Sequence, residues 1–122
     1  MSSYKDLKVW QLNQSCIVDS VKFLTKVSRD FGTKHIARQL FRAITSVGAN
    51  LSEGYESYEG KEYVRYINIA IRSAVEVDYW LSTLKAISQN FGDDIQSLEQ
   101  KNLEVIRMLK GLRKSIEEKR NP

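Results

Sequence analysis

The sequence has 122 residues, of which 42% are hydrophobic and 28% are charged, a balance typical of a globular chain and not of a disordered one. One proline and six glycines are too few for the tight turns of a β-sandwich or barrel, so we expect a single all-α domain over residues 1–122. The formal net charge of +4 is compatible with a polyanionic partner but is too small to establish one.

Secreted, membrane-spanning and disulfide-stabilised proteins do not fit this composition. The first residues lack the long apolar core of a signal peptide, and no stretch has the length of a membrane span. Cys16 is the only cysteine, so neither a disulfide framework nor a thiolate metal cluster is expected. The sequence therefore predicts a cytoplasmic protein with no membrane partner.

The first predicted helix, from Lys5 to about Arg29, carries two adjacent apolar stripes. One has a seven-residue repeat that Gln14 interrupts, and it comprises Leu7, Trp10, Ile17, Val21 and Leu24. The other comprises Val9, Leu12, Cys16, Phe23 and Val27. Because a helix of a monomer usually has one stripe, two interpretations are open. Either another subunit contacts the second stripe, or the helix is buried over most of its surface.

The second predicted helix runs from about Lys34 into the region Glu53–Gly60. It follows a break at Asp30–Thr33, in which Thr33 is a candidate N-cap. Its central part, Arg38–Glu56, also contains polar and small residues that a plain amphipathic helix does not need. These are Gln39, Ser46, Gly48, Asn50, Glu53 and Gly54.

The third predicted helix runs from about Lys61 to Gln89. A break at Asn90–Asp93 follows, with Asp93 as a candidate cap for the fourth helix, which ends in a charged tail. Short connections make neighbouring helices antiparallel. We therefore expect an antiparallel up-down-up-down four-helix bundle.

The sequence offers no convincing metal or catalytic site. Di-iron bundles need Glu-x-x-His pairs, and His35 is the only histidine. We therefore expect no metal, no cofactor and no catalytic residue. One remote alternative remains, because Arg29 and His35 fit the loose Arg-x4–6-His pattern of HEPN-type ribonucleases. Those enzymes carry the pair on one helix, whereas a break is expected here between the two residues.

The polar residues of the second helix are interpreted through the hairpin that it forms with the third. In that hairpin Ser46 lies level with Ser73, and Gln39 lies level with Glu76. A catalytic pair of Glu53 and Glu76 is disfavoured because the register places them far apart. We expect these groups to satisfy one another or to cap backbone at the helix end, and to fix helix register. The set is Gln39, Ser46, Asn50, Glu53, Gly54, Ser73 and Glu76.

Basic residues form stripes on two of the predicted helices. Phosphate contacts need only positive charge held along a surface, but acidic residues are interspersed, so a solvated face is the other interpretation. In a symmetric ring each stripe is repeated, which enlarges the positive electrostatic field of the surface. The candidate nucleic-acid-binding residues are Lys34, Arg38, Arg42, Lys61, Arg65 and Arg72.

Several of these motifs together resemble one known family. They are Tyr4-x-x-Leu7-x-Val9-Trp10, Gln39-Leu40-x-Arg42-Ala43, Ser46-Val47-x-x-Asn50-Leu51-Ser52-Glu53-Gly54 and Ile69-Ala70-x-x-Ser73-x-x-Glu76. The chain is similar to bacterial four-helix-bundle proteins encoded in intervening sequences of large-subunit ribosomal RNA genes. It departs from the usual pattern at Leu51–Ser52, where Ile–Ala is common, and at Arg72, where Gly is frequent. The loop around Phe31–Gly32 is also shorter and lacks the usual proline.

The resemblance implies a cytoplasmic bundle that assembles as a homopentameric, barrel-like ring. A related branch, the accessory proteins of diversity-generating retroelements, forms similar pentamers and is associated with RNA and a reverse transcriptase. No catalytic residues come with the resemblance. We therefore predict a non-enzymatic, RNA-associated oligomer. The alternatives are a protein scaffold or accessory subunit that does not bind RNA directly and, more remotely, a HEPN-like ribonuclease.

Overall fold

The computed structural model describes residues 2–57, 60–88 and 90–120, and all regular secondary structure in those ranges is helical. A short 3-10 helix, η1 (Tyr4–Asp6), precedes four α-helices. These are α1 (Lys8–Leu24), α2 (Phe31–Tyr55), α3 (Gly60–Ile87) and α4 (Gly92–Arg120). The predictions of an all-α class and of four helices are confirmed for these ranges. No helix found there is long and apolar enough to cross a membrane.

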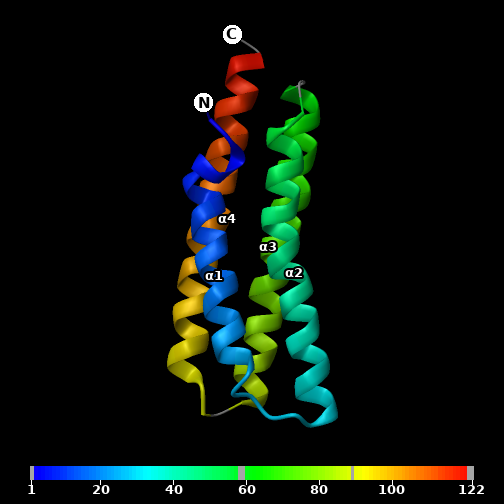
Figure 1. Cartoon of the computed structure of the whole chain (residues 1–122), viewed down its shortest axis with the longest axis vertical. Helices are drawn as coiled ribbons and strands as arrows, with labels where there is room; N and C mark the ends of the chain where they lie inside the picture. Colours follow the sequence, from blue (N-terminus) through cyan, green and yellow to red (C-terminus); the bar gives the residue numbers. More distant parts are fainter. Residues whose placement is uncertain (1, 58–59, 89, 121–122) are drawn as a thin grey trace.

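The four helices lie side by side along one long axis (Figure 1). The N-terminus, the end of α2 and the last turns of α4 lie at one end of the molecule, and the α1–α2 connection lies at the other. α2 contacts α1 and α3, and α4 contacts the same two helices. Going around the molecule, the helices therefore follow one another in chain order.

Helix α1 is shorter than predicted at both ends. Ser3 caps η1, because its hydroxyl accepts from the N–H of Lys5 and its own N–H donates to Asp6. Leu7 is extended, so α1 cannot begin before Lys8. At the other end, the hydroxyl of Thr25 donates to a backbone carbonyl of the last turn. Local side-chain bonds of this kind compete with helical ones, which explains why the apolar pattern overestimated the helix.

Helix α2 begins at Phe31, with Asp30 and not Thr33 as its N-cap. The Asp30 carboxylate accepts from the hydroxyl of Ser28 at 2.5 Å and from the N–H and hydroxyl of Thr33 at 3.0 Å each. The bond from Ser28 and those from Thr33 lower the pKa of Asp30. The cap therefore stabilises α2 above the ordinary carboxyl pKa and is lost as the pH falls through the lowered value. The structure has a break between the first two helices, but it lies earlier than the predicted Asp30–Thr33, because Phe31 and Gly32 already belong to the first turn of α2.

The ends of the other helices also differ from the predictions. Asp93 is not a cap, because α4 begins at Gly92 and Asp93 lies inside its first turn. There it and Asp94 interact favourably with the positive end of the helix dipole. The predicted end of the third helix, Gln89, lies outside the described residues.

One apolar core is shared by all four helices; one stripe of α1 lies within it, and Leu7, Trp10, Ile17 and Leu24 of the other stripe are partly buried against it. Val9, Cys16 and Phe23 are at most 4% exposed, whereas Val21 of the other stripe is 46% exposed and Val18, which belongs to neither stripe, is 52% exposed. Both stripes of α1 therefore contact the core of the single chain, and the exposed part of the helix is the side that carries Val18 and Val21. The other helices contribute mainly Leu40, Ile44, Val47, Leu51, Ile67, Leu81, Leu84, Ile95, Val105 and Leu109.

Two buried asparagines each join one helix to its neighbour. Asn13 of α1 donates to the carbonyl of Ile44 in α2 at 3.1 Å, and Asn102 of α4 donates to that of Ala74 in α3 at 2.8 Å. Both side chains are at most 1% exposed, and neither amide oxygen has a partner within the described chain. A half-satisfied amide adds little net stability, but its bond forms at only one register. The asparagines therefore specify the register of α1 against α2 and of α4 against α3.

Gly54 lets α2 approach α3 closely. A Cβ atom at this position would lie 2.8 Å from the Cβ of Tyr66 and 3.0 Å from the ring of Tyr63. Both contacts are tighter than ordinary van der Waals distances, and the nearest atom belongs to a rigid part of its side chain. The close approach of the two helices therefore requires glycine here.

We predict that Gly54→Ala destabilises the fold by about 1–3 kcal/mol, because overpacking outweighs the roughly 1 kcal/mol gained in helix propensity. The matched control is Gly111→Ala in α4, where a Cβ meets nothing within 4 Å. That change should stabilise the protein by up to about 1 kcal/mol. Urea unfolding at equal chain concentration measures both variants. A stabilised Gly54→Ala variant would contradict the close α2–α3 contact.

Candidate functional site

A seam of polar side chains, defined by Gln39, Arg42, Ser46 and Asn50 of α2 and Ser73, Glu76 and Trp80 of α3, joins these two helices. In one part of it the hydroxyls of Ser46 and Ser73 lie 2.9 Å apart. Asn50 donates to the carbonyl of Ser46 at 2.8 Å and to its hydroxyl oxygen at 3.1 Å. The hydroxyl oxygen of Ser46 accepts from Asn50, and either hydroxyl can be the donor between Ser46 and Ser73, because each has one hydrogen and two lone pairs. The three side chains therefore form a short ordered chain of bonds.

The other part of the polar seam centres on the carboxylate of Glu76. Its Oε2 atom accepts from the indole N–H of Trp80 at 2.9 Å and forms an ion pair with Arg42. The Nε of Arg42 also donates to Gln39 at 3.1 Å. The side chains of Arg42 and Glu76 are 58% and 34% exposed, so solvent limits the pair to below about 1 kcal/mol. A carboxylate held by two donors acts as an anchor and is poorly placed as a general base.

The remaining members of the predicted polar set lie outside this seam. Glu53 is exposed, and Gly54 is buried against Tyr63 and Tyr66 near the end of α2. Glu53 lies eleven positions after Arg42 on the same helix, which is roughly 16 Å along its axis. Since Arg42 is paired with Glu76, the two glutamates cannot form one acid–base site.

The six candidate basic residues differ in how much of their charge is already paired. Arg42 belongs to the seam, and Arg65 pairs with Glu62 and lies over the ring of Tyr66 at 4.4 Å. Lys34, Arg38, Lys61 and Arg72 are exposed. Across the described ranges, no ion pair involves Lys34, Arg38 or Arg72. These three have the charges most available to a phosphate.

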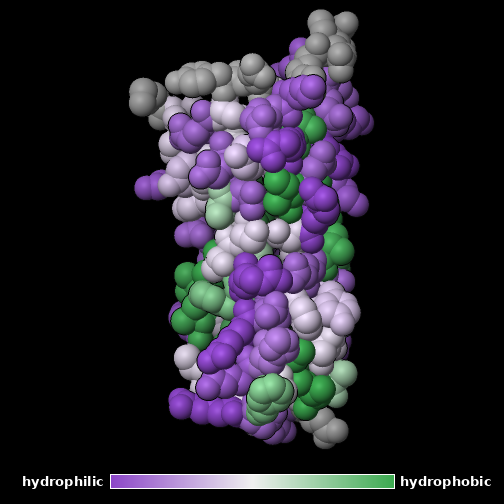
Figure 2. All heavy atoms as spheres, turned by 90° about the vertical axis from the view of Figure 1, so that its right-hand side faces the viewer, coloured by the Kyte–Doolittle hydropathy of each residue, from purple (hydrophilic) through white to green (hydrophobic). Residues whose placement is uncertain are grey.

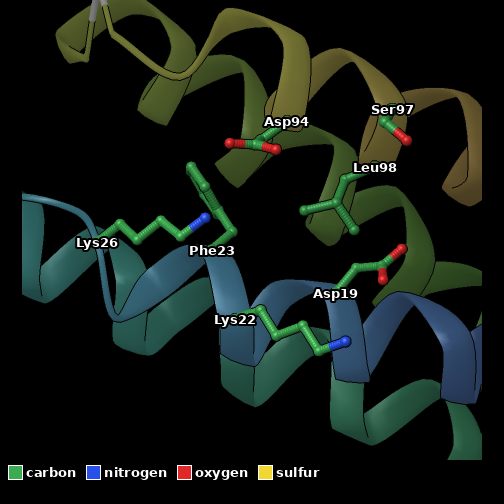
Figure 3. A pocket seen from close by; sticks show the side chains of 7 residues that line it. All are labelled: Asp19, Lys22, Phe23, Lys26, Asp94, Ser97 and Leu98. Atoms are coloured by element: carbon green, nitrogen blue, oxygen red, sulfur yellow. The ribbon is translucent and has the colours of Figure 1, made fainter.

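A polar groove of about 320 Å³ lies between α1 and α4 (Figure 3). Asp19 and Lys22 of α1 line it together with Lys26, which lies just after the end of α1, and Asp94 faces them from α4. These four charges sum to zero, and Asp19 is also paired with Lys101 of α4. No group of three His, Cys, Asp or Glu side chains within the described part of the chain is placed to hold a metal.

The residues considered for catalysis are not brought together. Arg29 lies in the connection before α2, and His35 is exposed on α2, so the two do not share a helix as a HEPN-type pair does. Cys16 is buried, and burial raises the pKa of its thiol to about 11. A thiol with so high a pKa is a poor nucleophile at neutral pH.

From the sequence we did not identify three polar residues that form side-chain hydrogen bonds in or near the contacts between helices. Asn13 falls between Val9 and Cys16 at core spacing, and Asn102 falls between Leu98 and Val105 in the same way. An amide within an apolar stripe is the signal that identifies such residues. Trp80 offers no comparable signal, because its bond to Glu76 depends on how the indole ring is oriented.

These features define an all-α protein of four helices whose buried and half-buried polar groups mainly join one helix to the next. The model of the 23S rRNA-intervening sequence protein family matches residues 5–111, and the chain belongs to this family. It is also similar to the crystal structure of a protein of unknown function from the S23 ribosomal protein family of Bacteroides thetaiotaomicron. The identity is 26% and the TM-score 0.77, over 87% of this chain and 98% of the other. No curated protein matches.

We predict that Ser46→Ala and Ser73→Ala each lower the free energy of unfolding by about 0.5–1.5 kcal/mol, because each removes the same hydrogen bond. The double variant should be destabilised by less than the sum of the two, since the shared bond can be removed only once. Ser115→Ala, on the exposed surface of α4, is the control and should change stability little. Strict additivity of the two seam variants would show that the hydroxyls are not coupled.

Proposed function

We propose that this protein is a non-enzymatic, RNA-associated bundle of antiparallel up-down-up-down helices that assembles as a ring-like homo-oligomer. The resemblance of its motifs favours a homopentamer. The observation that carries RNA association is the set of exposed cations on α2 and α3, with Lys34, Arg38 and Arg72 free of ion pairs among the described side chains. Membership of the intervening-sequence family supports the same proposal. The cytoplasmic location stays a prediction.

Assembly strengthens the electrostatic part of the proposal. The four positions from Lys34 to Arg38 correspond to roughly 6 Å along the helix, so their charges lie one turn apart on one face. A single pair of cations binds a polyanion weakly, because each phosphate contact contributes a modest counterion release. Symmetry repeats the pair in every subunit and thereby multiplies the contacts available to one RNA strand.

We propose that the protein is not an enzyme because the side chains that could react are already bonded, hard to ionise or far from a partner. The Glu76 carboxylate is held by Arg42 and Trp80, and burial raises the pKa of the Cys16 thiol. His35 is exposed on α2, and Arg29 lies in a different segment. The remote HEPN-like alternative predicts cleavage of RNA, whereas we expect a labelled RNA to stay intact after prolonged incubation.

The second candidate function is a protein scaffold or accessory subunit, for example to a reverse transcriptase, without direct RNA contact. Exposed apolar side chains such as Val18 and Phe41 favour it, because they provide contact area for protein and not for phosphate. This candidate predicts that the charge variants described next leave partner binding unchanged. A pull-down that recovers a protein after nuclease treatment, with no RNA affinity, would select it.

We predict that the double variant Lys34→Glu/Arg38→Glu binds a fluorescein-labelled single-stranded RNA at least about tenfold more weakly at low salt, because two phosphate contacts become repulsive. The slope of log K against log salt should become less negative by about 0.7 for each phosphate that the variant no longer neutralises. The control, Arg107→Glu/Lys110→Glu, makes the same change in charge on α4 and should reduce affinity much less. Fluorescence anisotropy measures all three proteins.

An equal reduction in the two double variants would show that net charge alone governs binding, which contradicts an interface on α2 and α3. Background binding by the unmodified protein would exclude direct RNA association. Lys61→Glu on α3 provides a second variant, at an exposed position outside the polar seam. We expect it to bind RNA more weakly without a change in assembly.

A further inference from the structure

An apolar groove of about 460 Å³ lies on the outer surface where α1 meets α2. Its apolar lining comes from Val21 and Leu24 of α1 and from Ala37 and Phe41 of α2. Val21 is 46% exposed and Phe41 is 39% exposed, so both still have contact area to offer. Figure 2 shows the side of the molecule that carries α2, where separate hydrophobic patches lie among hydrophilic side chains.

The edge of this α1–α2 groove is positively charged. Lys34, Arg38 and Arg42 line it, and no carboxylate is among its lining residues. Arg42 is already paired with Glu76, whereas the charges of Lys34 and Arg38 are not paired with any described side chain. A suitable occupant therefore combines apolar side chains with a carboxylate.

The outer side of α3 carries such a combination, which we call the α3 ridge. Val75 and Tyr79 are 53% and 60% exposed and lie one helical turn apart. Asp78 lies on the same side of the helix, and none of the described ion pairs or hydrogen bonds involves its carboxylate. The ring of Tyr79 contacts Trp80 edge-on, with centroids 4.8 Å apart, and Trp80 is bonded to Glu76. The ridge is therefore held in place before any partner arrives.

We propose that the α3 ridge of one copy docks into the α1–α2 groove of a second copy, with Asp78 pairing with Arg38 or Lys34 across the contact. This inference rests on the proposed homo-oligomer and names the two faces that form it. Groove and ridge are different surfaces of the same chain, so the contact is heterologous, and each copy can bind one neighbour on each side.

The positions of the two faces along the bundle favour a closed ring over an open filament. Phe41 is next to Arg42 in sequence, Val75 is next to Glu76, and Arg42 pairs with Glu76. The end of the groove and the ridge therefore lie at nearly the same height along the long axis, within about one helical turn. A contact between faces at the same height rotates each copy relative to the next with little translation, and such a rotation can close.

Occupation of the groove leaves cations for other ligands. A guanidinium has five N–H donors, so Arg38 can pair with a carboxylate on one side and keep donors directed toward solvent. Lys34 lies one turn further from the level of the ridge and remains at the edge of the contact. RNA association and docking can thus use neighbouring parts of α2.

The test uses one variant for each face. Val21→Asp places a charge in the groove, and Tyr79→Asp removes the apolar ridge, so each variant alone should scatter light as a chain of 14.1 kDa. A mixture of the two still contains one intact groove and one intact ridge. It should therefore form a heterodimer of twice that mass and nothing larger. Leu103→Asp, at an equally exposed position of α4, is the control and should keep the mass of the unmodified protein.

Folding is checked by circular dichroism, and Phe41→Glu replaces Val21→Asp if helix content falls. A second measurement uses charge: Asp78→Lys should weaken assembly, and Arg38→Asp in the same chain should restore it. An oligomer that survives both single variants, or a mixture that stays monomeric, overturns the assignment of these two faces. An unmodified protein that scatters as one chain overturns the proposed homo-oligomer itself.

Discussion

The polar layer at the middle of the bundle is the constraint on which the other contacts depend. Ser46 and Ser73 meet there, and the two carbonyls bound by the buried asparagines belong to Ile44 and Ala74, within two residues of that pair. All four helices are thus joined at one level. Such bonds contribute little net free energy, but an apolar core of Leu, Ile and Val tolerates many small shifts of one helix along another. The polar layer distinguishes one register from the rest.

This constraint also explains which parts of the structure could be predicted. Hairpin geometry explains why Ser46 lies level with Ser73, and why Gln39 lies near the Arg42–Glu76 pair. A short connection between two regular helices leaves little freedom for one helix to shift along the other. Helix ends follow less regular rules. Asp30 and Thr33 are both residue types that cap helices. Only the path of the backbone decides which of them is the N-cap of α2.

The surface of α1 shows a second limit of prediction. Its two stripes are equally apolar in sequence, yet Val9 is 4% exposed and Val21 is 46% exposed. Periodicity identifies which residues share a face but not which face turns toward the core. The charges on α2 are similar in this respect, since Arg38 and Arg42 share a stripe but only Arg42 is within reach of Glu76. Sequence supplies the set of cations, and tertiary contacts decide which of them are available.

The location of the free cations connects the proposed assembly with the proposed RNA association. Arg72 lies one turn before Val75 on α3, so the proposed docking of the α3 ridge brings it toward the end of the neighbouring copy's groove edge that carries Arg42. Like charges brought together raise the energy of the junction, and one carboxylate, Asp78, offsets only part of that cost. A polyanion bound along the junction would neutralise the remainder. RNA binding and assembly would then favour each other, because each reduces the electrostatic cost of the other.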